Sequence, residues 1–315
     1  MVGTAGHAAA ARWVDWQLAH LSLAPYAGHR FALPYAADGE EFTNFAAVIP
    51  GTNRTLPPLL LGAHYDSVIP HPCADDNAAA VAIVLTVAEQ LRATTRERDI
   101  VIAIFDAEEP PYFQTPAMGS VRFCEDQTDE RGFHAALILD LVGHDVTLPK
   151  LGRFTPPAVK NLLVVQGAES HPDLAAIVGS HLPLRGVSLI AALNAYMADM
   201  SDHYAFRRAG VPFLFFSCGQ WAHYHQPTDT PDRLNYRKMA RIAETVWAFA
   251  ESTAAADLSG LVASEDFTSE VEAATIRKSL GFGLRGIGTK RMQARSDVNA
   301  FAKILLSTMD ENGNP

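Results

Sequence analysis

The stretch LLLGAHYDSVIPHPCADDNAAAVAIVLTVAEQL, residues 59–91, decides the fold. Its first three leucines form a continuous apolar run, which is typical of a strand covered on both faces of a sheet. The Ala/Val/Leu-rich segment from about Asn77 to Arg92 predicts a helix with Asp76 or Asn77 as its N-cap. A buried strand followed by a helix indicates an α/β sheet, in which ligands bind beyond the carboxyl ends of the strands.

Ionisable side chains gather where this strand ends. His64 and Asp66 are two residues apart, so both side chains point the same way on an extended chain. A carboxylate that accepts the second ring N–H of a histidine fixes the tautomer that a metal-binding histidine needs. The pair Asp75 and Asp76 follows nine residues after Asp66. The strand end therefore carries an imidazole and several carboxylates.

Other apolar runs repeat this arrangement. Strands are predicted at 42–48, 59–64, 99–105, 135–139, 161–166 and 211–218, and helices at 8–22, 77–92, 119–124, 172–181 and 236–253. The helix at 8–22 carries Trp13 and Trp16 at roughly helical spacing, and packing is the role expected for both. Strands that alternate with helices predict an α/β fold with a mostly parallel sheet.

Five potential metal ligands lie at four of these strand ends. They are His64, Asp75, Glu109, Asp140 and His225. Imidazole and carboxylate together suit zinc, with cobalt or manganese as alternatives. Three converging carboxylates cannot all stay ionised unaided, whereas two cations with one bridging carboxylate would neutralise them. Each residue alone also fits an ordinary role, as a core histidine, a helix cap or a charged turn, and His203 and His223 compete with His225. Their joint position after apolar strands favours a metal site.

Glu108 and Glu109 are consecutive residues at a strand end, so their side chains point to different sides. One of them can bind metal while the other faces the bound water. A carboxylate in that second position can act as general base and then as general acid to the leaving group.

Composition bounds the function. The chain has 315 residues, a net charge of −10 and three cysteines. A negative charge argues against a nucleic-acid partner, and three cysteines do not suggest a disulfide framework. No apolar run is long enough for a membrane span, and no signal peptide is visible at the N-terminus. We expect a cytoplasmic protein, although a secreted mature form would look the same. A homodimer is compatible with its apolar loops.

The organisation changes near residue 255. Residues 1–255 hold every strand and helix named above, and residues 256–315 form a Gly-containing extension whose role the sequence leaves open. Within the extension, residues 276–295 carry six basic residues and no acidic one. A solvated tail and a contact surface for an anionic partner both fit that pattern.

The residues together resemble the M28 group of zinc exopeptidases, which are co-catalytic metallo-aminopeptidases and their relatives. The resemblance covers roughly residues 40–255, in the family's order. It is carried by GAHYDSV (62–68), ADDNAAAVA (74–82), FDAEE (105–109), MGS (118–120), LDLVG (139–143), SDHYAFRRAGVP (201–212) and YHQPTDTPD (224–232). It implies a three-layer α/β/α architecture around a central, mostly parallel mixed sheet, the zinc-exopeptidase (phosphorylase/hydrolase-like) fold.

The resemblance also implies roles for single residues. His64 and Asp140 would hold one zinc, Glu109 and His225 the other, and Asp75 would bridge them. A cis peptide bond is expected after the bridging residue, between Asp75 and Asp76. Glu108 matches the family's general base. Asp66 matches the residue that orients the metal-bound histidine, and Asp202 matches a polar position near the site.

One departure from the family pattern bears on function. The loop PPYFQTPAM (110–118) is longer than the turn usual in family aminopeptidases. Tyr112 and Phe113 in this loop are either apolar substrate contacts or anchors of the loop itself. Glutaminyl cyclases, a sister group with one zinc, carry a longer insertion there but lack the closing motif that this chain has.

The function expected from the resemblance is a dinuclear zinc exopeptidase that acts on peptides, most simply an aminopeptidase. The metals would polarise the scissile carbonyl and activate a bridging water, and Glu108 would take the water's proton. The alternatives are a cyclase-like acyltransferase with a single zinc, a carboxypeptidase, and a binding protein with a dead site.

Overall fold

A mixed nine-stranded sheet forms the centre of the protein in the computed structural model, which describes residues 1–148, 150–260, 264, 268–280 and 295–310. The strands are β1 (Ala24–Pro25), β2 (Ala32–Ala37), β3 (Glu40–Ile49), β4 (Leu59–His64), β5 (Ile100–Phe105), β6 (Ala135–Leu139), β7 (Leu162–Gln166), β8 (Ser188–Ala192) and β9 (Phe213–Ser217). They follow the order β1-β3-β5-β4-β6-β9-β7-β8, and β2 also pairs with β3.

The centre of this sheet is parallel and its flanks are antiparallel. Strands β5, β4, β6 and β9 run parallel to one another, whereas β3 is antiparallel to β5 and β7 is antiparallel to β9. The carboxyl ends of the four central strands therefore meet at one edge of the sheet, which is where the sequence places the candidate ligands. The expected α/β class and mixed sheet are confirmed. The sequence-based prediction missed β1, β2 and β8, which are short or lie at the edges.

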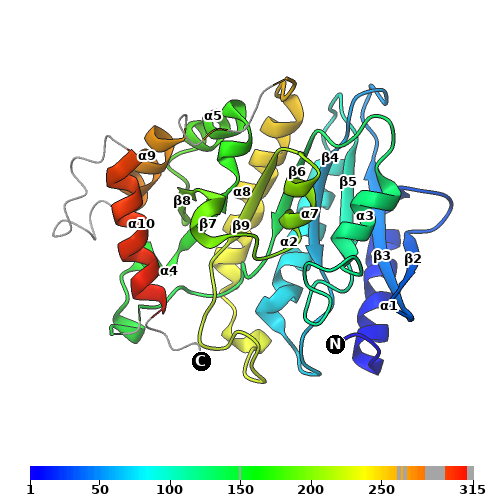
Figure 1. The fold of residues 1–315 in the computed structure, drawn as a ribbon, viewed down its shortest axis with the longest axis horizontal. Coiled ribbons are helices and arrows are strands. Elements are labelled where there is room, and N and C mark those ends of the chain that lie inside the picture. Colours follow the sequence, from blue (N-terminus) through cyan, green and yellow to red (C-terminus); the bar gives the residue numbers. More distant parts are fainter. Residues whose placement is uncertain (149, 261–263, 265–267, 281–294, 311–315) are drawn as a thin grey trace.

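Helices cover both faces of the sheet (Figure 1). They are α1 (Ala5–His20), α2 (Ala79–Arg92), α3 (Gly119–Gln127), α4 (Pro157–Lys160), α5 (Pro172–Ser180), α6 (Asn194–Met197), α7 (His203–Arg208), α8 (Tyr236–Ala255), α9 (Ser269–Leu280) and α10 (Arg295–Asp310). Helices α2 and α8 pack together on one face and α3 and α7 on the other, which gives three layers.

Each face of the sheet has its own apolar core. The larger core joins α1, α2, α5, α8, α9 and α10 to one face through residues such as Leu18, Val84 and Phe249. The smaller core is aromatic, and Phe105 and Phe123 contact edge to face within it. Burial of one such side chain contributes about 1.5–3 kcal/mol. Two well-filled cores fix the strand ends, and so fix the backbone from which the site residues project.

Helix α1 differs from its predicted packing. Val14 and Leu18, four residues apart, are the buried positions of this helix. Trp13 and Trp16 are 45% and 56% exposed, so the expectation that they pack into the core is wrong. The reason is helical geometry, because residues i and i+4 share one face and Val14 and Leu18 already occupy the face toward the sheet. Trp16 instead stacks on His20 at the surface.

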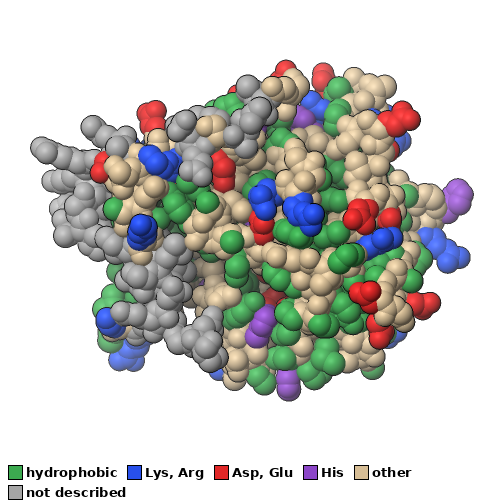
Figure 2. Space-filling view, viewed as in Figure 1, with side chains coloured by type: hydrophobic (Ala, Val, Ile, Leu, Met, Phe, Trp, Pro, Cys, Tyr) green, Lys and Arg blue, Asp and Glu red, His purple; other side chains and the backbone are tan. Residues whose placement is uncertain are grey.

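The C-terminal extension packs against the same sheet. Helix α9 lies on β8 and α10 lies on α9, at the opposite end of the sheet from α1 (Figure 1). Most of the basic segment predicted at 276–295 lies outside the described residues. No described helix is long and apolar enough to cross a bilayer. On the face shown in Figure 2, acidic and basic side chains are intermixed.

Candidate metal centre

The carboxyl ends of β4, β5 and β6 deliver four of the predicted residues to one place. His64 is the last residue of β4, Asp140 directly follows β6, and Glu108 and Glu109 follow β5. The loop after β9 adds His225. His64 is fully buried and the carboxylates of Glu109 and Asp140 are nearly so.

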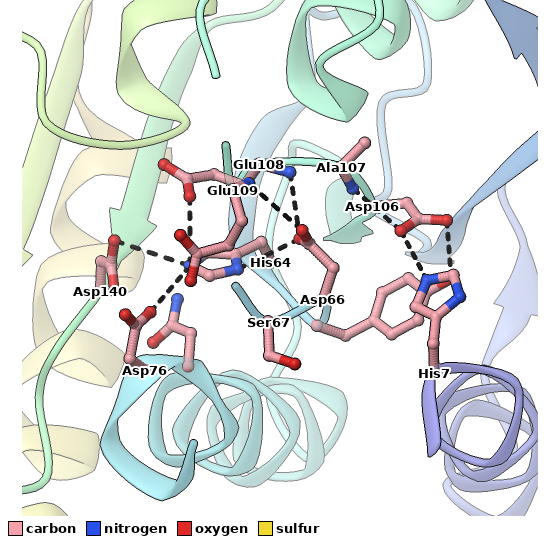
Figure 3. Close-up of polar contacts among 12 residues, drawn as sticks. His7, His64, Asp66, Ser67, Asp76, Asp106, Ala107, Glu108, Glu109 and Asp140 are labelled. Atoms are coloured by element: carbon pink, nitrogen blue, oxygen red, sulfur yellow. Dashed lines mark hydrogen bonds and ion pairs between the residues drawn. The ribbon is translucent and has the colours of Figure 1, made fainter. Parts of the chain in front are cut away.

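Two groups of ligand-type atoms form there, and Asp76 belongs to both. His64, Asp76 and Asp140 make the first group, and Asp76, Glu109 and His225 make the second. In each group the donor atoms lie within 4.8 Å of one another. Asp76 Oδ1 is 3.5 Å from His64 Nε2, and Asp76 Oδ2 is 3.1 Å from His225 Nε2. One carboxylate therefore faces both groups, and Figure 3 shows it beside His64.

The structure assigns this shared position to Asp76, so the prediction for Asp75 is wrong by one residue. Asp75 Oδ1 accepts a hydrogen bond from the backbone N–H of Gly143 at 2.6 Å, and its Oδ2 lies 2.6 Å from His144 Nδ1. Both oxygens of Asp75 thus point away from the two donor groups. The cis peptide bond joins Asp76 and Asn77, one bond later than predicted.

The local backbone explains the shift. The chain is kinked within the segment Ala74–Ala78, where Asp76 (φ −111°, ψ 82°) and Asn77 (φ −137°, ψ 30°) have non-helical dihedrals. The predicted helix begins only at Ala79, and its N-cap position is Ala78, which makes no side-chain cap. Neither Asp76 nor Asn77 therefore caps the helix as expected. The kink turns the carboxylate of Asp76 toward the strand ends.

Asp66 links the histidine to the glutamate pair. Its Oδ1 is 3.3 Å from His64 Nδ1, the ring nitrogen opposite the donor groups. The same carboxylate accepts the backbone N–H groups of Glu108 at 3.0 Å and Glu109 at 3.2 Å. Asp66 is buried, so these bonds fix the ring orientation and the start of the glutamate loop together (Figure 3).

The two glutamates diverge as their spacing predicted. Glu109 Oε2 lies 3.1 Å from His225 Nε2, within the second donor group. Glu108 belongs to neither group, and its Oε2 lies 3.7 Å from His64 Nε2. Of the competing histidines, His203 lies 3.1 Å from Asn194 Oδ1 and His223 lies 2.7 Å from Thr228 Oγ1.

Burial and the close approach of several carboxylates shift the pKa values of the site residues. Burial, together with Glu109 and Asp140, raises the pKa of Asp76 to about 8 against the opposing effect of His225. Burial and the Asp140 carboxylate likewise raise the pKa of Glu108 well above its usual range. Burial alone would lower the pKa of His64, but the Glu108 and Asp140 carboxylates outweigh it and raise that pKa. The pKa of His225 rises to about 9, because its bonds to Asp76 and Glu109 outweigh burial.

The donor set fits divalent zinc. Among the buried polar atoms without a hydrogen-bond partner, five belong to the donor groups and lie close together; they are His64 Nε2, Asp76 Oδ2, Glu109 Oε1, Asp140 Oδ1 and His225 Nε2. Buried polar groups are normally paired, so a concentration of unpaired ones at a single point indicates a missing partner. A cation would satisfy these atoms and neutralise the carboxylates, and a mix of imidazole and carboxylate ligands is typical of zinc.

A cavity of about 110 Å³ opens directly onto the donor groups. Glu108, Glu109 and Asp140 form its acidic end. Its other walls are largely apolar and consist of Pro110, Phe113, Leu141, Met197, Met200 and Phe215. Among the described residues, no lysine or arginine lines this cavity.

The three residues expected to contact substrate have different positions. Phe113 lines the cavity. Tyr112 is not among the lining residues; its ring contacts Phe42 edge to face with 4.9 Å between ring centroids, which fits an anchor of the loop, and its role as a substrate contact stays a prediction. Asp202 is fully buried behind the site, beside Glu108, and does not line the cavity either. Burial raises the pKa of Asp202 to about 7.

Residues that the sequence-based analysis did not single out also shape the site. Asp229 accepts the backbone N–H groups of Asp75 at 2.9 Å and Asp76 at 3.1 Å, and it lies four residues after His225. Tyr224 lines the cavity and stacks on His225. Both belong to the matched segment 224–232, and their position next to His225 was the available signal.

Comparison with known proteins gives the class. The sequence model of peptidase family M28 matches residues 44–250. The chain therefore belongs to peptidase family M28, as its motifs predicted. An uncharacterised protein of Escherichia coli K12, YfbL, is 29% identical over 217 residues, which are 60% of this chain and 65% of YfbL. The chain thus spans just under two thirds of that relative's length.

Solved structures confirm the fold. LapA aminopeptidase of Legionella pneumophila is 19% identical with a TM-score of 0.60, over 78% of this chain and 65% of that one. An aminopeptidase from Aneurinibacillus sp. strain AM-1 is 22% identical with a TM-score of 0.54, over 72% and 51%. A Zn-dependent exopeptidase from Parabacteroides distasonis is 17% identical with a TM-score of 0.57, over 79% and 90%. At these identities the likeness concerns the fold alone.

Proposed function

We propose that this protein is a zinc-dependent aminopeptidase that removes N-terminal residues from peptides. One observation carries the proposal: two three-residue donor groups share Asp76, and Glu108 lies beside them without belonging to either. Family membership and the zinc aminopeptidases among the structural neighbours support the same conclusion. His64, Asp76 and Asp140 would hold one zinc ion, and Asp76, Glu109 and His225 a second.

Bound zinc supplies Lewis acidity, which polarises a carbonyl and lowers the pKa of water toward neutrality. The protein's own part is proton transfer and orientation. Glu108 is buried and beside the donor groups, so it takes a proton from the attacking water and delivers it to the leaving amine. Asp66 keeps both His64 and the Glu108 backbone in place.

The cavity supports an aminopeptidase over a carboxypeptidase. A free N-terminus is a cation, and the described lining residues include no lysine or arginine that would repel it. A free C-terminus is an anion and needs a basic partner, which the described lining residues do not provide. The apolar wall with Phe113, Met197 and Met200 favours an apolar side chain on the residue removed.

The first test combines metal analysis with a peptide panel. We expect two zinc ions per chain and cleavage of unblocked peptides only, with N-acetylated peptides left intact. A single zinc with cyclisation of N-terminal glutamine and no cleavage would establish the acyltransferase alternative. Two bound metals without turnover on a broad panel would establish a binding protein instead.

The second test addresses the general base. Glu108→Gln keeps the shape of the side chain but cannot accept the proton, so kcat should fall by roughly 10²–10⁴-fold with metal content and melting temperature unchanged. Glu89→Gln, an exposed position on α2, is the matched control and should retain full activity. Near-wild-type turnover of Glu108→Gln at full metal content would remove Glu108 from the mechanism.

A further inference from the structure

The C-terminal extension, here the helices α9 and α10, is bonded to the edge of the sheet. Thr275 Oγ1 accepts the backbone N–H of Ala191 at 3.0 Å, and Ser279 Oγ donates to the carbonyl of Leu189 at 2.6 Å. Both partners belong to β8, the last strand of the sheet. Ala273 and Ile276 of α9 are buried in the larger core. The extension therefore covers the edge strand β8 and forms part of the folded core.

A second set of bonds joins the extension to the short helix α6. Asn299 Oδ1 accepts from the hydroxyl of Tyr196 at 2.5 Å, and Arg295 Nη1 lies 3.2 Å from the same hydroxyl. Arg295 in turn donates to the Glu272 carboxylate at 2.7 and 2.8 Å and to Thr268 Oγ1 at 2.7 Å. The Glu272 side chain is buried, so this ion pair is shielded from water. The network holds α10, α9 and α6 in one arrangement.

Helix α6 separates two cavities. An apolar cavity of about 40 Å³ lies between α6 and the extension and is lined by residues that include Tyr196, Met197, Ile276, Val298 and Phe301. Met197 also lines the cavity that opens onto the donor groups. The two cavities thus share Met197 as a common wall. Met is unbranched and flexible, so its position depends on what supports it.

We infer that the C-terminal extension is a specificity-determining element, because it sets the position of Met197 in the substrate cavity through Tyr196 and α6. The inference rests on the proposed aminopeptidase function. With the extension bonded to Tyr196, the wall is firm and the cavity closes around a large apolar side chain. When that bond is lost, Met197 shifts into the apolar cavity behind it, and contact with a large side chain weakens. A small side chain such as alanine does not reach this wall.

The test compares selectivity in variants that cut the link from either side. Tyr196→Phe removes the hydroxyl but keeps the ring, and Asn299→Ala removes the acceptor on α10. In each, kcat/KM for an N-terminal phenylalanine substrate relative to an alanine substrate should fall roughly three- to tenfold through KM, with kcat unchanged. The double variant should lose no more than Tyr196→Phe alone, because that change already removes the Tyr196–Asn299 bond. Ala300→Ser, at an exposed position of α10, is the matched control.

Metal content and melting temperature, measured on each variant, separate this role from a purely structural one. A selectivity ratio within twofold of wild type in both Tyr196→Phe and Asn299→Ala would overturn the inference, and so would an equal loss on both substrates. Calorimetric binding of free L-phenylalanine and L-alanine to the zinc-loaded proteins gives a readout without turnover. If no protein cleaves peptides but phenylalanine binding weakens in the two variants, the proposed function fails while the role of the extension stands.

Discussion

Asp106 and Asp76 are both buried carboxylates at the same edge of the sheet, and they differ in the groups that their oxygens contact. Asp106 has a partner for every direction: the backbone N–H groups of Thr43 and Ala107 at 2.9 Å, the Tyr65 hydroxyl at 2.9 Å and His7 Nε2 at 2.7 Å. Asp76 instead lies among other ligand-type atoms, with Oδ1 3.5 Å from His64 Nε2 and Oδ2 3.1 Å from His225 Nε2, and it accepts no backbone N–H from the described part of the chain. Figure 3 shows the two clusters side by side.

The difference shows that the hydrogen bonds of a buried carboxylate indicate its role. A buried carboxylate whose oxygens are all hydrogen-bonded stabilises the fold, because its desolvation is compensated within the protein. A buried carboxylate beside other acids and unpaired imidazoles is incomplete, and a cation completes it. By this criterion Asp106 is structural and Asp76 belongs to the proposed metal centre, although both are buried aspartates at the same edge of the sheet. Asp75, with both oxygens bonded, belongs with Asp106.

The largest expected effect separates Asp76 from its neighbour. Asp76→Asn removes the charge shared by both donor groups. Zinc affinity should therefore fall by more than the roughly 10–100-fold loss that is typical when a residue supporting a metal ligand is mutated. Asp75→Asn is the matched control and should keep its zinc, because an asparagine can still accept from Gly143 and donate to His144. Zinc titration with a competing chelator measures both. Equal zinc loss in the two variants would contradict the assignment of the shared position to Asp76.

The next effect concerns Asp106, whose carboxylate is fully hydrogen-bonded. Asp106→Asn places an amide donor against groups that already donate, so the free energy of unfolding should fall by about 2 kcal/mol. Zinc affinity should stay at the wild-type value, because Asp106 belongs to neither donor group. Urea unfolding and chelator competition on the same samples check the two statements. A variant of normal stability that loses zinc would reverse the comparison.

A smaller effect tests how the backbone that carries Asp76 is held in place. Asp229→Asn weakens the bonds to the backbone N–H groups of Asp75 and Asp76, so the Asp76 carboxylate is less well positioned. We expect roughly tenfold weaker zinc binding, which is the low end of the range for residues that hydrogen-bond to a metal ligand without binding the metal. Asp232→Asn, an exposed acid in the same motif, should bind zinc as wild type does. Unchanged affinity in Asp229→Asn would show that the backbone holds Asp76 unaided.

The smallest effect concerns His134, a buried histidine whose ring Nε2 lies 2.9 Å from the backbone carbonyl oxygen of Thr253. Burial and the nearby Arg98 charge lower the pKa of His134 to about 4, although its bond to the Thr253 carbonyl acts in the opposite direction. The unfolded chain therefore binds a proton at higher pH than the folded one. Stability is full above about pH 6.5 and declines as the pH falls toward 4, by about 1 kcal/mol between pH 7 and 5.

Urea unfolding at both pH values measures this dependence. His134→Gln removes the titrating group, so the variant should lose about 1 kcal/mol less than wild type between pH 7 and 5. An identical pH dependence in the two proteins would mean that His134 is protonated in the folded state.

Sequence alone predicted a large part of the fold. Buried parallel strands have a continuous apolar run that polar loops interrupt, so β4, β5, β6, β7 and β9 were found near their true bounds. The strands β1 and β2 lack this run and were missed. The short strand β8 was also missed, although its central residues Leu189, Ile190 and Ala191 are apolar and buried. The two tryptophans of α1 were misplaced because hydrophobicity indicates a preference for burial and does not say which face of a helix meets the sheet.

The sequence by itself determined which segments meet at the proposed metal centre. Parallel strands bring their carboxyl ends to one edge of the sheet, and the candidate ligands directly follow those ends in the sequence. Only the tertiary structure decided between Asp75 and Asp76, since consecutive side chains diverge and the backbone dihedrals of one turn select which carboxylate faces inward. Those dihedrals depend on Asp229, Gly143 and His144, which lie 154, 68 and 69 residues from Asp75 along the chain. Likewise, only the tertiary structure placed the C-terminal extension behind Met197, because no local pattern encodes a contact between α10 and α6.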